Sequence, residues 1–176
     1  KKLHIAFIHE VKRHPFRFAM ADSTGVKFTY ARVLASIIVL TKKLFPHKDR
    51  SDVRDDMVGV LLPASCSALL ANGAIYFAGK VPVNLNFTVS NEILSAAIQK
   101  CRIKTIITSR KFLEKVKIEA RDEMVYLEDL KTDIQWHEKV RAIVAAVVLP
   151  AFLIKALFIR GDTTTIDDVA TIIFSS

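Results

Sequence analysis

Between Met57 and Leu127 the chain alternates short apolar segments with stretches of helical composition. There are four such segments, each of strand length: Met57–Leu62, Val81–Leu85, Thr105–Thr108 and Met124–Leu127. Short apolar strands that alternate with helices are typical of a parallel sheet covered on both faces. The pattern therefore predicts an α/β fold in three layers, with a mostly parallel sheet between helices.

The helices expected between these strands begin at serines. A serine at this position accepts a hydrogen bond from a backbone N–H group in the first turn of the helix. The expected helices run from Ser65 or Ser67 to Gly79, from Ser90 to about Cys101, and over Arg110–Lys117 behind Ser109.

The segment before this alternation has its own local pattern. Pro15 is expected to end an amphipathic helix, because proline disfavours helical backbone in the residue before it. A hairpin with a turn at Ser23-Thr24-Gly25 and a helix capped by Thr29 should follow. The expected elements are a helix at Leu3–His14, strands within Phe16–Ala21 and Val26–Phe28, and a helix at Tyr30–Phe45.

The last third predicts a helix over Asp133–Leu149, a break at Pro150, further helix over Ala151–Ile159 and a final strand at Val169–Phe174. The first helix places on one stripe the apolar residues Val140, Ile143, Val144 and Val147.

Two roles fit the apolar helical stretch Trp136–Ile159. It can cover the sheet as a core helix, or it can lie at a membrane interface with its apolar side down. The basic residues that flank it are Lys139, Arg141, Lys155 and Arg160. Its longest nearly uncharged run, Ala142–Ile154, contains Pro150 and is shorter than the about 20 residues of a spanning helix.

Composition limits the class of protein. Of 176 residues, 51% are hydrophobic and 25% are charged, which excludes a disordered or low-complexity chain. The net charge of +8 indicates an anionic partner. Because the basic residues are scattered along the chain, a nucleic-acid surface is not expected. An acidic protein or an anionic lipid fits better.

Tests for reactive and metal-binding motifs are negative. Cys66 and Cys101 have no CxxC spacing, so we expect two free thiols of a cytosolic protein. The turn Leu62–Ser67 contains no glycine, and the chain has neither GxGxxG nor a Walker sequence.

Histidines give no site either. The segment His47–Asp52 has the His-x4-Asp spacing of glycerolipid acyltransferases, but in a charged loop where we expect no catalysis. On one helix His4, His9 and His14 face different sides and cannot share a metal ion.

Three stretches resemble one family of enzymes: Lys104–Lys115 (KTIITSRKFLEK), Val125–Lys131 (VYLEDLK) and Asp167–Ser176 (DDVATIIFSS). They are similar to the adenylating half of bacterial acyl-acyl-carrier-protein synthetase/2-acylglycerophosphoethanolamine acyltransferase, within the adenylate-forming (AMP-binding) superfamily. Val81–Thr88 (VPVNLNFT) and Phe28–Tyr30 fit the same superfamily.

The resemblance implies an ATP- and Mg²⁺-dependent ligase that activates a fatty acid as its acyl-adenylate. The acyl group would pass to acyl carrier protein, or to coenzyme A, and from the carrier protein to a lysophospholipid. It further implies a cytoplasmic enzyme at the inner face of the cell membrane.

The resemblance also implies where the nucleotide site would begin. These enzymes carry a Ser/Thr/Gly-rich phosphate loop directly after the strand that matches Val169–Phe174, and Ser175 and Ser176 match its first two positions. The remaining loop residues, the ribose-binding acid, the magnesium-binding Glu and the catalytic Lys have no counterpart among these 176 residues.

We therefore expect residues 1–176 to form one N-terminal subdomain, cut at the start of the phosphate loop. It would have no catalytic or metal-binding residues, no bound cofactor and no adenylating activity alone. A homodimer through the exposed sheet edge is a further expectation. The alternative hypothesis is a non-catalytic module that binds acyl carrier protein or a membrane surface.

Overall fold

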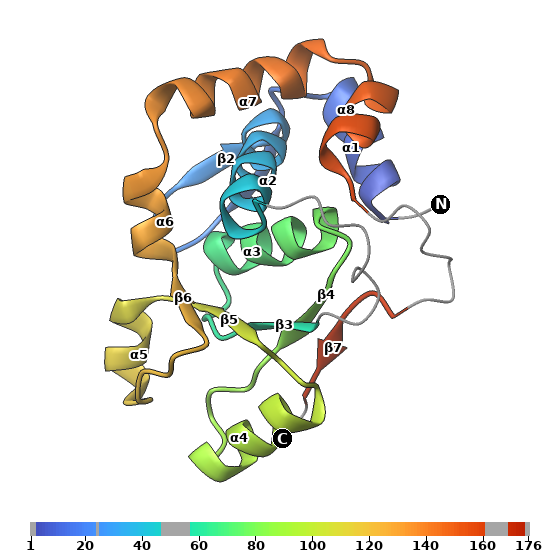
Figure 1. Ribbon diagram of the computed structural model, residues 1–176. Coiled ribbons are helices and arrows are strands. Elements are labelled where there is room, and N and C mark those ends of the chain that lie inside the picture. The colour runs from blue at the N-terminus through green and yellow to red at the C-terminus, as the bar shows by residue number, and fades with distance from the viewer. Residues whose placement is uncertain (1–2, 24, 47–56, 161–168, 175–176) are drawn as a thin grey trace.

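The computed structural model describes residues 3–23, 25–46, 57–160 and 169–174, and its centre is a five-stranded sheet (Figure 1). Neighbouring strands are parallel in the order β6-β5-β3-β4-β7. The strands are β3 (Met57–Val60), β4 (Val81–Asn84), β5 (Thr105–Thr108), β6 (Met124–Tyr126) and β7 (Ile172–Ile173). The predicted α/β class with a parallel sheet is confirmed.

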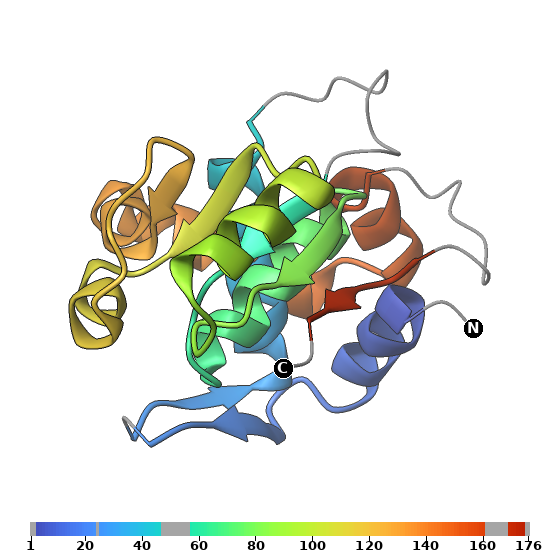
Figure 2. The same cartoon turned by 90° about the horizontal axis from the view of Figure 1, so that it is seen from below.

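Helices cover both faces of this sheet. The helices α4 (Asn91–Lys100) and α5 (Arg110–Val116) pack on one face, which Figure 2 shows with α4 in front. The helix α3 (Cys66–Phe77) packs on the other face. Beyond α3 lies α2 (Tyr30–Leu44), and α7 (Trp136–Val148) packs on α2. The chain therefore has more helical layers on the α3 side than the predicted three-layer arrangement contains.

The core explains why apolar residues follow one another directly in the strands. Ile106 and Ile107 are adjacent in β5 and both are fully buried, Ile106 among the residues of α4 and α5 and Ile107 among those of α3. Successive side chains of a strand point to opposite faces of the sheet. A strand between two helical layers therefore favours apolar residues at successive positions, and not only at alternate ones.

The predicted caps are present in the structure. Ser65 accepts a hydrogen bond from the N–H of Ala68 at 3.3 Å, which identifies it, not Ser67, as the cap of α3. Equivalent bonds are made by Thr29, Ser90 and Ser109 at the starts of α2, α4 and α5.

The N-terminal elements also agree with the sequence. The helix α1 spans Leu3–Arg13, and β1 (Phe18–Ala21) pairs antiparallel with β2 (Lys27–Thr29). The turn between the two strands uses Gly25 at φ +81°, a conformation that glycine adopts without steric strain.

The last third differs from the prediction in its boundaries. A separate helix, α6 (Leu127–Asp133), precedes α7 and was not expected. Ile134 and Gln135 between them are extended. The helix α7 starts only at Trp136, where the N–H of Gln135 donates to Glu138 Oε2 at 2.9 Å. After α7, Pro150 caps α8 (Ala151–Phe158).

The burial of α7 also differs from the core-helix interpretation. Val140, Ile143 and Val144 lie on the exposed side of α7, and its buried residues are Ala142 and Ala146. Since α3 and α2 already cover this side of the sheet, α7 meets α2 and not the sheet. Of the two roles that the sequence leaves open for this segment, that of a core helix covering the sheet is therefore not found, because α7 contributes its buried residues to the core on α2.

The final strand is shorter than expected, because only two residues of Val169–Phe174 pair with β4. The His47–Asp52 segment, whose role was rejected on sequence grounds, lies outside the described residues. Within the described ranges, every helix is too short or too polar to cross a bilayer.

Candidate functional site

The order of the strands creates a reversal point at the carboxyl edge of the sheet. From β3 the chain proceeds to β4 on one side, whereas from β5 it proceeds to β6 on the other side. Open α/β sheets bind their ligands in the crevice outside the carboxyl ends of the strands at such a point. A ligand-binding site is therefore expected at the loops that follow β3 and β5.

A cleft of about 440 Å³ lies at this point. The hairpin, the loop after β3, α5 and α6 all contribute to its lining. The polar and charged residues that line it are Asp22, Ser65, Cys66, Ser67, Ser109, Lys111, Lys115, Glu128 and Lys131.

A carboxylate from the hairpin is hydrogen-bonded to the N-terminus of α3. The N–H of Cys66 donates a hydrogen bond to Asp22 Oδ2 at 3.0 Å. Burial and the hydrogen bond to Asp22 both raise the pKa of the Cys66 thiol. A thiol with a raised pKa remains protonated near neutral pH, so Cys66 is unsuited to act as a nucleophile.

A second carboxylate fills the turn after β5. The Ser109 hydroxyl donates to Glu128 Oε1 at 2.7 Å, and the N–H of Arg110 donates to Glu128 Oε2 at 3.3 Å. Burial raises the pKa of Glu128, but the hydrogen bonds from the Ser109 hydroxyl and the backbone N–H groups outweigh it, so its pKa lies below the ordinary value. Glu128 is therefore an anion that fastens the start of α6 to the start of α5.

The hydrogen bonds of these two carboxylates limit which ligands the cleft can bind. The turns after β3 and β5 are bonded to the chain's own Asp22 and Glu128, so they are not open to a phosphate. The cationic side chains at the cleft are Lys111, Lys115 and Lys131, all exposed. The cleft is thus a basic surface. No cluster of three or more metal-ligating side chains occurs in the part of the chain that the structure describes.

A network of amide groups positions the last strand. Asn72 of α3 and Asn84 of β4 exchange two hydrogen bonds of 3.1 Å. The Asn84 amide also donates to Thr171 Oγ1 at 3.2 Å, and the Thr171 hydroxyl donates to the carbonyl of Pro82 at 3.0 Å. The residue before β7 is therefore tied to both β4 and α3.

The predicted phosphate-loop residues Ser175 and Ser176 follow this strand in sequence. They lie outside the described residues, so their role stays a prediction. The strand before them is parallel to β4, with Val83 opposite Ile172 and Asn84 opposite Ile173.

Sequence reasoning missed Asp22, Asn84 and Glu128 as structural parts of this edge. Asn84 and Glu128 stand at or just after the end of a predicted strand, where side chains at the carboxyl edge are expected, so a search of those positions could have found them. The sequence around Asp22 does not mark it as part of this edge, because its hydrogen-bond partner Cys66 is 44 residues away.

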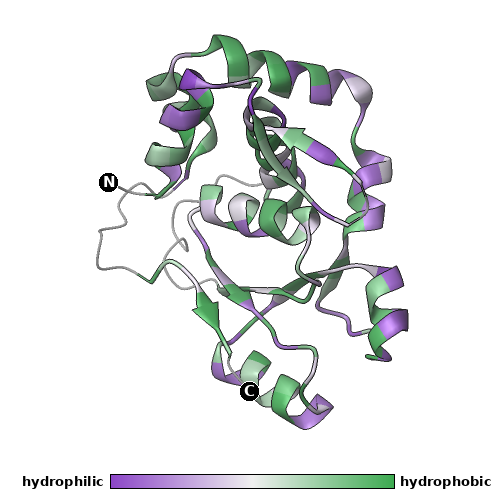
Figure 3. Cartoon of the chain, turned by 180° about the vertical axis from the view of Figure 1, so that it is seen from behind, coloured by the Kyte–Doolittle hydropathy of each residue, from purple (hydrophilic) through white to green (hydrophobic). Residues whose placement is uncertain are grey.

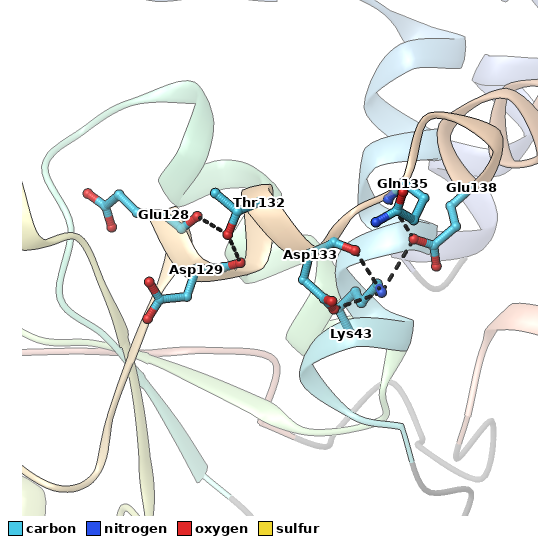
Figure 4. Close-up of polar contacts among 7 residues, drawn as sticks. All are labelled: Lys43, Glu128, Asp129, Thr132, Asp133, Gln135 and Glu138. Carbon is cyan, nitrogen blue, oxygen red and sulfur yellow. Dashed lines mark hydrogen bonds and ion pairs between the residues drawn. The ribbon is translucent and has the colours of Figure 1, made fainter.

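The helices behind the cleft are joined through Lys43 at the end of α2 (Figure 4). Its ammonium group lies 2.8 Å from Asp133 Oδ2 and 3.3 Å from Glu138 Oε2. The hydrogen bond to Asp133 is the largest influence on Lys43 and raises its pKa. Lys43 thus holds the end of α6 and the first turn of α7 against α2.

His4 and His9 of α1, and His14 directly after it, point in different directions. His4 is buried and contacts the Tyr76 ring at a centroid distance of 5.6 Å, whereas His9 and His14 are exposed. Cys66 and Cys101 are both free thiols, as predicted.

A family model described as "AMP-binding enzyme" matches residues 7–176. The fold is also similar to solved structures, although each is below 25% in sequence identity and shows the fold alone. VinN is 18% identical, with a TM-score of 0.70 over 99% of this chain and 42% of that chain. A fatty acyl CoA synthetase of Mycobacterium tuberculosis is 16% identical, with a TM-score of 0.64 over 98% of this chain and 32% of that chain.

A further similar structure was determined with ligands. It is the O-succinylbenzoate coenzyme A synthetase (MenE) of Bacillus subtilis in complex with ATP and magnesium ion. It is 19% identical, with a TM-score of 0.59 over 70% of this chain and 33% of that chain. The chain thus spans less than half the length of these three structures.

Proposed function

The chain belongs to the AMP-binding enzyme family, and from that premise we propose that it is part of an ATP-dependent fatty-acid ligase. The enzyme would form an acyl-adenylate and transfer the acyl group to the phosphopantetheine thiol of acyl carrier protein. The transferred chain would then reacylate a lysophospholipid. We place this enzyme in the cytoplasm, at the inner face of the membrane that contains its lipid product.

The observation that carries the proposal is the match of residues 7–176 to the family, together with the strand order. The strand β7 precedes Ser175 and lies parallel to β4 at one margin of the sheet. The specific choice of an acyl-carrier-protein ligase is supported by the stretches Lys104–Lys115 and Val125–Lys131, which resemble that family.

The described residues do not by themselves fit a nucleotide. The turns after β3 and β5 are bonded to Asp22 and Glu128, and we find no metal-ligand cluster within the described ranges. ATP, when bound to the complete ligase, would supply the adenylyl group that activates the carboxylate. The described residues instead shape the scaffold, since Asn84 and Thr171 hold the start of β7.

We therefore propose that the 176-residue chain does not adenylate alone. The test is ATP–pyrophosphate exchange with a panel of fatty acids. We expect no fatty-acid-dependent exchange from this chain, and exchange from a protein extended through a phosphate loop ending in Pro-Lys-Gly and a C-terminal domain. Turnover by the short chain would refute its inactivity, and a folded extended protein without exchange would refute the ligase.

A second candidate is a module that binds acyl carrier protein. It is favoured by the cleft, where Lys111, Lys115 and Lys131 are exposed and the two carboxylates are bonded to backbone N–H groups. Basic residues at the rim of an interface mainly increase the rate of association with an acidic partner, and salt screens them.

Titration with acyl carrier protein at low and high salt tests this second candidate. Lys115→Glu should weaken binding at low salt by roughly tenfold, because it reverses one charge at the interface. The matched control Lys104→Glu reverses an exposed lysine outside the cleft and should bind like the wild type. Absence of binding by the wild type at low salt would remove the candidate.

A further inference from the structure

The outer surface of α7 carries an exposed apolar stripe. Trp136, Val140, Val144 and Val148 recur at every fourth position, and Ile143 lies beside them. Trp136 is 74% exposed and Val148 is 69% exposed. Figure 3 shows hydrophobic colour along most of this helix. We call these five residues the outer stripe.

The inner side of α7 has the opposite character. Its buried residues are Ala142 and Ala146, whose small side chains allow α7 to lie close to α2. A surface helix of a globular protein normally turns its large apolar side chains inward. In α7 the large side chains face outward, so packing within this chain does not explain the outer stripe. Exposed apolar surface of this kind marks an interaction site.

The next helix also exposes large apolar side chains. Phe152 is 69% exposed and Leu157 is 52% exposed, whereas Ile154 of α8 is fully buried. Both α7 and α8 contact α1, which supports them from beneath. Because Phe152 and Leu157 are five positions apart, they face different sides of α8. The outer stripe together with Phe152, which follows it in sequence across Pro150, is here called the α7–α8 face.

Contacts at both ends fix the orientation of α7. At its first turn, Glu138 pairs with Lys43 of α2. At its last turn, the ammonium group of Lys12 of α1 donates to the carbonyl oxygen of Ala146 at 3.3 Å and to that of Val147 at 2.5 Å. A cation at a helix C-terminus also interacts favourably with the helix dipole. The outer stripe is thus held outward by the fold.

Basic residues flank the stripe on both sides. At about 100° per residue, Arg141 lies about 100° to one side of the centre of the stripe. Lys139 lies on the other side, toward α2, where it lines a cavity with Arg32. Lys139 and Arg141 are both exposed, whereas the acidic Glu138 is paired with Lys43. Long basic side chains can extend past an apolar surface to place their charges near lipid headgroups. The charge around the stripe is therefore complementary to an anionic surface.

We propose that the α7–α8 face docks on an anionic lipid bilayer, with α7 lying in the plane of the interface. Trp136 would sit at the level of the headgroups, where tryptophan is enriched. The valines would enter the boundary of the acyl chains, and Lys139 and Arg141 would contact anionic headgroups. The inference does not depend on the ligase activity, because it rests on the exposed side chains and the charges that flank them.

Trp136 is the only tryptophan of the chain, so its fluorescence reports on this face directly. The 176-residue chain is mixed with vesicles of phosphatidylcholine alone, or of phosphatidylcholine with phosphatidylglycerol. We expect flotation with the anionic vesicles and a blue shift of the Trp136 emission. Failure to float with anionic vesicles at low salt would overturn the proposal.

Two variants test the apolar contact. Val144→Asp should lower the partition coefficient by at least about tenfold, because it places a charge where an apolar side chain would enter the acyl-chain boundary. The matched control is Ile93→Asp, which changes an isoleucine of α4 that is 58% exposed. This variant should bind like the wild type. Trp136→Ala, at an exposed position in the first turn of α7, should also weaken binding. Unlike Val144→Asp, this variant adds no charge to the helix, so it tests the apolar contact alone.

The charge variant Lys139→Glu/Arg141→Glu should reduce binding to anionic vesicles by at least about tenfold, since it replaces two basic side chains with acidic ones near an anionic surface. Its control, Lys100→Glu/Lys104→Glu, reverses two exposed lysines elsewhere. Equal flotation of all variants would refute the proposal. So would a Val144→Asp variant that abolishes self-association in light scattering while vesicle binding persists, since the face would then join two copies of the chain.

Discussion

Replacing Glu128 with glutamine tests whether a carboxylate is required between the turns after β5 and β6. In the wild type its two oxygens accept hydrogen bonds from the Ser109 hydroxyl and the Arg110 N–H. Glutamine has one carbonyl oxygen for this purpose, and its amide group would face the other donor. Glu128→Gln therefore loses one hydrogen bond to a charged acceptor and weakens the second.

The magnitude follows from these contacts. A hydrogen bond to a charged group contributes about 1.5–3 kcal/mol, and the partial exposure of Glu128 reduces this. We expect the free energy of unfolding to fall by about 1–2 kcal/mol. For a chain of this size that corresponds to a decrease in Tm of about 2–8 °C.

The pH dependence gives a sharper test. The pKa of Glu128 is lower in the folded chain than in the unfolded chain, chiefly because the hydrogen bonds from Ser109 and the backbone outweigh its burial. Its contribution is therefore fully present above the unfolded value of about 4.3 and is lost as the pH falls through the folded value. The difference in stability between wild type and Glu128→Gln should be constant above about pH 5 and shrink below it.

Urea unfolding monitored by circular dichroism at several pH values measures this difference. The matched control is Glu119→Gln, which neutralises an exposed glutamate after α5 and should change stability little. If both variants lose the same free energy, or if the Glu128→Gln difference does not decrease in acid, the role given to this carboxylate is wrong.

Two further predictions concern the sheet edge and the thiols. In a double-mutant cycle of Asn72→Ala and Asn84→Ala, the losses of stability should be coupled by about 1 kcal/mol, because the two amides bond to each other. Additive losses would contradict the pairing. Amide hydrogen exchange at Ile172 should be faster in Asn84→Ala than in the wild type. In native buffer Cys101 should react with a maleimide at least about tenfold faster than Cys66, whose burial and raised pKa suppress the thiolate, and equal rates would show that Cys66 is accessible.

Local patterns predicted much of the fold. Ser65, Ser90 and Ser109 act within their own helices, because a cap bonds to an N–H group three residues later. The strands were recognisable because a strand buried on both faces is a short, nearly continuous apolar run. These features depend on neighbours in sequence, so the sequence shows them directly.

The direction in which α7 faces could not be predicted in this way. The stripe that includes Val140 and Val144 is plain in the sequence, but periodicity does not say whether a stripe faces the core or the outside. That depends on α2, which already covers α3, and on the small residues Ala142 and Ala146 that meet it. The same holds for the cleft, because the bond between Asp22 and Cys66 joins segments 44 residues apart.

The bond from Lys12 to α7 also bears on how the chain folds. Lys12 and Ala146 are 134 residues apart, so their contact closes a loop of most of the chain, and contacts of such long range form slowly. During synthesis α1 leaves the ribosome long before α7 exists, with Ile8 and Val11 not yet covered by their complete set of partners. Because α1 also packs on α2, which follows it closely in sequence, α1 is expected to dock on α2 early and to complete its core contacts only when α7 and α8 have been made.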